Sequence, residues 1–359
     1  MTKFFCADSS RQADEDIIGS GTNYQTYILI ESRPPWKSEA FESKFIPDNL
    51  KNLVAEIKRS KLSVRFLLIN SGQLKSTHEK TKILIYDKKN EWLSNGYTKQ
   101  EFNVENFEQI APVVRQYLSG EVPDCESEEN QARDILVCTH GSHDKCCARY
   151  GNPFYFHAVT TIFNLGLSNV RIWQSSHFGG HRFAPTAIDF PDGRYYGVLD
   201  QESFSSILTR TGDINCLKRV YRGWGILPTS IQVLERELIL RYGWDWFNYK
   251  VAGKIIEQNT DKSVIQAEVA FEQPDGTIHT YQATLVKDES KTLRLKGSCG
   301  TAKESEFVKY SVENLTLDSE KISEVETHEY VRNVKINKGF ARLRKSEFFV
   351  KSQGINPSH

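Results

Sequence analysis

The chain has 359 residues, and its 46 lysines and arginines are balanced by 46 aspartates and glutamates, so its formal net charge is zero. Hydrophobic residues make up 39% of the chain and charged residues 26%, as in ordinary soluble globular proteins of two or three domains. A neutral chain has no global basic field, so neither nucleic acid nor a membrane is expected as a partner.

The cysteine pattern favours a reducing compartment. The chain has seven cysteines, an odd number, and three of them lie within residues 138–147. Secreted disulfide scaffolds show an even and dispersed pattern, so clustered thiols point instead to metal or redox chemistry. No apolar run has the length of a membrane span, and residues 1–16 lack the basic and apolar regions of a signal peptide. We therefore expect a cytoplasmic protein.

Strands and helices alternate in the first third of the chain. Segments rich in β-branched and apolar residues predict strands at 26–32, 64–70 and 82–87. Apolar residues at helical spacing predict helices at 48–60 and 107–118. This order of elements predicts an α/β or α+β layer.

Two segments of this region are predicted to lie outside the regular elements. The run Pro34-Pro35-Trp36 is expected to form an extended surface turn with a half-buried tryptophan, rather than to contribute to a redox site. The polar, acidic segment 120–131 is expected to be a linker.

A second alternating region follows this linker. A buried strand is predicted at 135–138, a helix at 147–165 and another strand at 170–174. A Pro-Asp-Gly turn between two β-rich arms predicts a hairpin at 187–199, and a short helix is expected at 214–224.

The character of the sequence changes after Pro228. An amphipathic helix that ends in aromatic residues is predicted at 229–247. Three alternating segments at 262–272, 277–286 and 292–297 then predict an antiparallel meander.

We find no internal repeat in the sequence, and the mixed acidic and basic blocks of the tail predict solvated surface. The expected fold class is α/β (α+β) with three parts: an N-terminal α/β part (1–130), a central part (131–227) and a smaller antiparallel β-rich part (228–359).

Candidate metal ligands follow two of the central strands. Cys138 ends the first strand and Cys147 lies nine residues later, whereas His177 and His181 occupy the loop after the second strand. The carboxyl ends of such strands form the ligand-binding edge of open α/β sheets, and a crossover helix would bring the two loops together. Two thiolates and two imidazoles can hold either Zn²⁺ or a [2Fe–2S] cluster. Gly179 and Gly180 allow the backbone to fold tightly around such a centre.

Three further donors lie in the first loop. Cys146 is adjacent to Cys147, and either thiol could be the second ligand while the other is a bystander. His140 and His143 are expected to support the site rather than to bind metal, because four ligands are already available.

The motifs of this stretch resemble the sucrase/ferredoxin-like family. The resemblance covers about residues 1–225, and its specific motifs are confined to 138–186. They are Cys138-Thr139-His140-Gly141, Asp144, Cys146-Cys147-Ala148 and Gly151 in the first loop, and Ser176-His177 with the run from Gly179 to Thr186 in the second.

The family resemblance implies a thioredoxin-like ferredoxin domain with a [2Fe–2S] cluster. It implies Cys138 and Cys147 on one iron, with His177 and His181 on the other, and it favours Cys147 over Cys146 by spacing. Neutral imidazoles in place of two thiolates make the centre less negative, so a reduction potential above that of an all-cysteine cluster is expected.

Three more residues are expected to bind or tune the cluster. Thr139 and His140 are expected next to the first thiolate, where hydrogen bonds to sulfur would tune the potential. Arg182 is expected to balance the charge of the cluster or to dock an acidic partner, with a salt bridge that fixes the loop as the alternative.

The leading functional hypothesis is a one-electron carrier or reductase component with an unknown redox partner protein. The second is a structural Cys2His2 zinc site in a protein-interaction module. A thiol enzyme that uses Cys146 and Cys147 ranks last, because vicinal cysteines form a strained disulfide. No motif places two carboxylates across a sugar bond, so a sucrose hydrolase is not supported.

Overall fold

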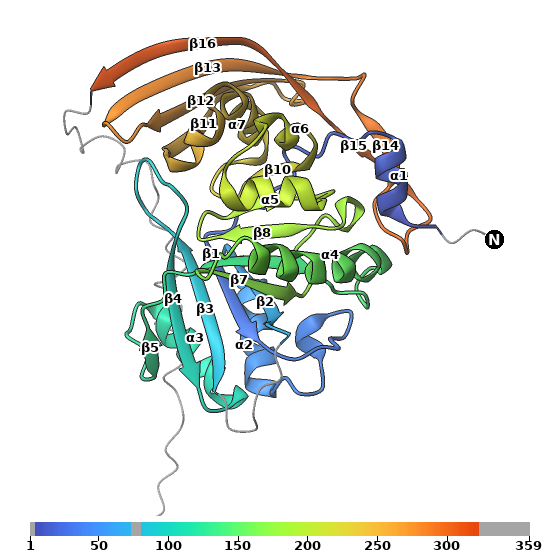
Figure 1. The fold of residues 1–359 in the computed structure, drawn as a ribbon, viewed down its shortest axis with the longest axis vertical. Coiled ribbons are helices and arrows are strands. Elements are labelled where there is room, and N and C mark those ends of the chain that lie inside the picture. Colours follow the sequence, from blue (N-terminus) through green and yellow to red (C-terminus); the bar gives the residue numbers. More distant parts are fainter. Residues whose placement is uncertain (1–3, 73–79, 323–359) are drawn as a thin grey trace, which may run out of the picture.

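The computed structural model describes residues 4–72 and 80–322, with side chains to residue 319 (Figure 1). A mixed sheet of ten strands forms the centre, in the order β10-β9-β8-β6-β7-β2-β1-β3-β4-β5. A four-stranded antiparallel sheet and a two-stranded hairpin complete the β structure. The predicted α/β class is confirmed.

The first half of the ten-stranded sheet is one βαβββα unit. Its elements are β1 (Thr26–Glu31), α2 (Asp48–Ser60), β2 (Val64–Asn70), β3 (Thr81–Lys88), β4 (Tyr97–Val104), a short η2 (Phe107–Gln109) and α3 (Ile110–Ser119). β1 and β2 are parallel, and β3 and β4 follow on the other side of β1 as antiparallel neighbours. The spatial order of these strands is β2-β1-β3-β4.

The second half has the same connectivity. Its elements are β6 (Arg133–Cys138), α4 (Lys145–Asn164), β7 (Val170–Ser175), β8 (Ala187–Phe190), β9 (Arg194–Tyr196) and α5 (Gln201–Thr209). β6 and β7 are parallel, β8 is antiparallel to β6, and the order is β7-β6-β8-β9. The structure therefore contains a repeated topology that the sequence did not reveal, because connectivity recurs here without recurring residue patterns.

The two halves meet where β2 and β7 pair in antiparallel fashion. The paired residues are Ile69 with Ser175 and Asn70 with Gln174, all at the carboxyl ends of their strands. Edge strands β5 (Glu126–Glu128) and β10 (Tyr221–Trp224) close the two sides of the sheet. β5 lies within the segment that the sequence predicted as a linker.

Alternating residues of the central strands enter two different cores. Ile28 and Ile30 of β1 pack in the core under α2 and α3. Tyr27 and Leu29 of the same strand face the larger core that also includes residues of α4, α5 and the C-terminal part. This is the period of two expected of a strand that is covered on both faces.

The C-terminal part packs a helix against an antiparallel sheet that curves over it (Figure 1). Its elements are α7 (Thr229–Tyr242), η5 (Gly243–Asn248), β11 (Lys250–Gln258), β12 (Val264–Glu272), β13 (Thr277–Lys287) and β16 (Tyr310–Ile322). The predicted pairing of the first two meander strands is confirmed as β12 with β13.

The third predicted meander strand has a different partner. β14 (Leu293–Lys296) pairs with β15 (Glu304–Phe307) in a separate hairpin, while β16 takes the place beside β13. The prediction was wrong because alternation identifies a strand but not the strand with which it pairs.

The remaining short elements are α1 (Cys6–Gln12), η1 (Ala40–Glu42), η3 (His181–Phe183), η4 (Ile214–Cys216) and α6 (Leu217–Val220). Among the described residues, no helix is long and apolar enough to cross a membrane.

Candidate metal sites

The first turn of α4 delivers two thiols to two different places. Asp144 caps the helix, and its side chain accepts a hydrogen bond of 2.9 Å from the backbone N–H of Cys146. Consecutive residues of an α-helix point about 100° apart, so Cys146 and Cys147 face different neighbours. The structure places Cys147, and not Cys146, next to Cys138 at the end of β6.

Three of the four predicted ligands meet at the carboxyl ends of β6 and β7. His177 Nδ1 lies 3.8 Å from the sulfur of Cys138 and 3.6 Å from that of Cys147. These three ligand atoms all lie within 4.8 Å of one another. Both cysteines are fully buried, whereas His177 is partly exposed.

His181 lies between this group and a second one. Its ring centroid is 5.2 Å from that of His177. Its Nδ1, however, lies 3.4 Å from the sulfur of Cys6 and 3.5 Å from a carboxylate oxygen of Asp144. The fourth predicted ligand is therefore adjacent to the first group without being part of its closest cluster.

His140 holds the histidine loop in place. Its Nδ1 accepts a hydrogen bond of 3.1 Å from the backbone N–H of His177, and its Nε2 donates one of 2.8 Å to the carbonyl of Lys37. Both ring nitrogens are used and the side chain is buried, which fits the supporting role predicted for it. The ring of His143 stacks on that of His177 at a centroid distance of 4.0 Å.

The loop after β1 packs against this site. Trp36 is buried, and its ring meets that of His140 edge-on at 5.7 Å. The carbonyl of Trp36 also accepts a hydrogen bond of 2.6 Å from the hydroxyl of Ser142. Residues 33–35 are exposed, as predicted for a surface turn. The prediction of a half-buried tryptophan was wrong, because the neighbouring half of the sheet brings the ligand loop over Trp36.

Two of the predicted tuning residues are engaged in structural contacts. The backbone N–H of Thr139 donates a hydrogen bond of 3.1 Å to the carbonyl of Ser175, which joins the two ligand loops. Arg182 forms an ion pair of 3.0 Å with the buried Glu15 and stacks on Phe307 at 3.6 Å. The contacts of Arg182 include the salt bridge considered as its alternative role.

The site favours one thiolate and neutral imidazoles. Burial raises the pKa of Cys138, but hydrogen bonds from Cys147 and from the N–H groups of His140 and Phe178 outweigh it and lower the pKa below its ordinary value. The hydrogen bond to Cys138, together with burial, raises the pKa of the Cys147 thiol. Burial lowers the pKa of His177 to about 2, so this ring is neutral and its lone pair is available to a metal.

Arg222 is a site residue that the sequence analysis missed. It is fully buried and donates hydrogen bonds to the carbonyls of Gly179 and Ser20, at 3.2 and 2.7 Å. Among the described residues it has no carboxylate partner, and burial lowers its pKa to about 10. A Cβ on Gly180 would lie 2.5 Å from the guanidinium carbon. The sequence analysis predicted a short helix over 214–224, whereas residues 221–224 form β10, so nothing marked Arg222 as a site residue.

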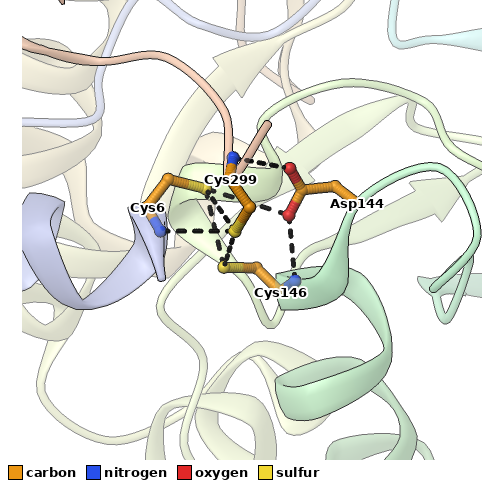
Figure 2. Close-up of side chains that lie close together, drawn as sticks. All are labelled: Cys6, Asp144, Cys146 and Cys299. Carbon is orange, nitrogen blue, oxygen red and sulfur yellow. Dashed lines mark hydrogen bonds between the residues drawn. The ribbon is translucent and has the colours of Figure 1, made fainter. Parts of the chain in front are cut away.

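A second group of potential ligands lies on the other side of the first turn of α4. It consists of Cys6, Cys146, Cys299 and Asp144, whose ligand atoms lie within 4.8 Å of one another (Figure 2). A hydrogen bond from Cys6 lowers the pKa of Cys146 to about 7. The sequence analysis missed this group, because its members are up to 293 residues apart.

Comparison with family models identifies one family over more than half of the chain. The sequence model of the family described as sucrase/ferredoxin-like matches residues 17–223. A similar curated protein is "Altered inheritance of mitochondria protein 32" of Meyerozyma guilliermondii, 33% identical over 107 residues. That match covers 28% of this chain and 38% of the relative. No solved structure matches the chain.

Proposed function

Because the chain belongs to the sucrase/ferredoxin-like family, we propose that it is a one-electron redox protein with a [2Fe–2S] cluster held by Cys138, Cys147, His177 and His181. The observation that carries this proposal is the meeting of two buried thiols and a neutral imidazole at one edge of the sheet, with a second imidazole beside them.

The residues present suit such a cluster. Its chemistry is the uptake and release of one electron, and thiolate and imidazole are both known iron ligands. Backbone N–H groups already favour the thiolate form of Cys138. The buried Arg222 supplies a positive charge that has no carboxylate partner in the described chain and can offset a negative centre.

The expected compartment and partner follow from the same chemistry. All seven cysteines are free thiols, which suits a reducing compartment such as the cytoplasm. The name of the curated relative refers to the inheritance of mitochondria, so localisation by fluorescence microscopy is the direct test. An electron carrier also requires a redox partner protein, which co-purification under anaerobic conditions can identify.

A structural zinc site is the second candidate. Cys138, Cys147 and His177 are close enough for all three to bind a single ion. Zinc bound by cysteine and histidine is tetrahedral and redox-inactive, so the function would then be interaction rather than electron transfer.

Anaerobic purification tests the proposal. We expect a coloured protein with iron and acid-labile sulfide in equal amounts, an absorption band in the visible region and an electron paramagnetic resonance signal after reduction. His177→Cys and His181→Cys should keep the cluster and change both spectra, because each replaces an imidazole with a thiolate. A colourless protein after reconstitution with iron and sulfide would refute the cluster, and zinc bound by Cys138 would establish the second candidate.

A further inference from the structure

Three thiols from distant parts of the chain converge next to the proposed cluster site. Cys6 opens α1, Cys146 lies in the first turn of α4, and Cys299 lies in the turn between β14 and β15. Their sulfur atoms are separated by 3.5 Å (Cys6–Cys146), 3.3 Å (Cys146–Cys299) and 3.7 Å (Cys6–Cys299). Cys6 and Cys146 are fully buried.

These separations suit thiolates that share one metal ion. Sulfur atoms at about 2.3 Å from a tetrahedral zinc ion lie about 3.8 Å apart, close to the observed values. A disulfide needs a sulfur–sulfur distance of about 2.05 Å. Two backbone N–H groups also point at the sulfurs: that of Ala7 at Cys146 (3.4 Å) and that of Cys6 at Cys299 (3.5 Å).

Asp144 offers the fourth ligand. One of its carboxylate oxygens lies 3.9 Å from the sulfur of Cys6 and accepts from the N–H of Cys146. The other accepts from the N–H of Cys299 at 3.0 Å. The backbone of two thiol-bearing residues therefore orients the carboxylate toward the sulfurs, as Figure 2 shows. Three soft thiolates and one carboxylate oxygen form a ligand set that zinc accepts.

We propose that Cys6, Cys146, Cys299 and Asp144 bind a structural Zn²⁺ ion that is separate from the redox centre. The ion would fasten α1 and the β14–β15 hairpin to the start of α4; Figure 1 shows α1 beside this hairpin. A seven-residue helix and a hairpin of two four-residue strands are too short to be stable alone. A shared metal ion provides the missing stabilisation.

Zinc and iron contents of the full-length protein test this proposal. We expect about one zinc per chain, with X-ray absorption at the zinc edge giving three sulfur ligands at about 2.3 Å and one oxygen ligand at about 2.0 Å. Cys299→Ser should lose zinc and keep iron, sulfide and the visible spectrum. Cys138→Ser should do the reverse, and Cys216→Ser, which changes a thiol in η4, should change neither.

Several results would overturn the proposal. They are a zinc-free protein, a disulfide among Cys6, Cys146 and Cys299 in anaerobically prepared samples, or zinc that survives Cys299→Ser but not Cys138→Ser. A nitrogen instead of an oxygen ligand would overturn the assignment of Asp144. The absorption measurement uses unmodified protein, so the test does not depend on whether a variant folds. Zinc without iron would support this site while refuting the proposed redox function.

Discussion

Replacing Gly151 by alanine tests the close approach on which the cluster site depends. Gly151 lies inside α4, where alanine is favoured over glycine by about 1 kcal/mol. A Cβ at this position would, however, lie 2.0 Å from the carbonyl oxygen of Cys138, whereas real Cβ contacts are essentially never shorter than 3.0 Å. The helix or the strand end must therefore move by about 1 Å.

The steric effect should outweigh the helix propensity. Overpacking costs about 1–3 kcal/mol, and the obstacle here is a backbone atom that cannot rotate away, which favours the upper part of that range. After subtraction of the propensity gain, we expect the free energy of unfolding to fall by about 1–2 kcal/mol. The shift would also separate Cys147 from Cys138, so less cluster should be bound.

Urea unfolding and iron content provide the assay. His157→Ala, at an exposed position of the same helix, is the matched control and should change neither value. If Gly151→Ala bound a full cluster and were as stable as the parent protein, the close approach of α4 to β6 would not be what holds the two thiols together.

Three further predictions concern charge. With His177 as a ligand, the reduction potential should fall with rising pH by up to about 59 mV per pH unit if reduction is coupled to protonation. His177→Cys should lower the potential at a fixed pH. Voltammetry that shows neither effect would exclude imidazole ligation. Arg222→Gln removes a buried positive charge and should lower the potential by about 60 mV or more, whereas Arg182→Gln, which changes an ion-paired arginine, should shift it less; equal shifts would contradict this. Burial opposes ionisation of Glu15, but its ion pairs with Arg182 and Lys309 lower its pKa overall. The stability that the ionised carboxylate contributes is therefore present above the unfolded pKa and is lost as pH falls through the folded pKa. Glu15→Gln should therefore destabilise the fold by about 3 kcal/mol at neutral pH and less in acid, and a pH-independent effect in thermal melts would refute the role of the ion pair.

The sequence identified strongly apolar elements and missed half-exposed ones. β1, β2, β3, β6 and β7 were predicted within two residues of their ends, because buried strands are near-continuous apolar runs. β4 was missed because the residues after Tyr97 are polar and largely exposed, and because two of its four buried C-terminal residues are the polar Glu101 and Asn103. The hairpin β14–β15 was beyond prediction, since its partner strand carries two glutamates in four residues.

Sequence reasoning found ligands of the first metal site and missed the second site. Cys138 and His177 were found because one ends a recognisable strand and the other follows one, and the topology then brings the parallel strand ends together. Cys6 and Cys299 have no neighbour in the sequence that marks them. Cys6 lies ahead of the first element predicted from the sequence, and only tertiary packing brings it to α4.

The repeated topology shows how one half of the sheet supports chemistry in the other. In the second half, the loop after the first strand carries Cys138 and the start of α4; in the first half, the corresponding loop after β1 carries Trp36 and Lys37 instead of thiols. Antiparallel pairing of β2 with β7 brings the carboxyl ends of both halves together. The loop after β1 can then hold His140 through the carbonyl of Lys37 and the ring of Trp36. His140 in turn holds the backbone of His177. We infer that the first half contributes orientation rather than ligands to the site.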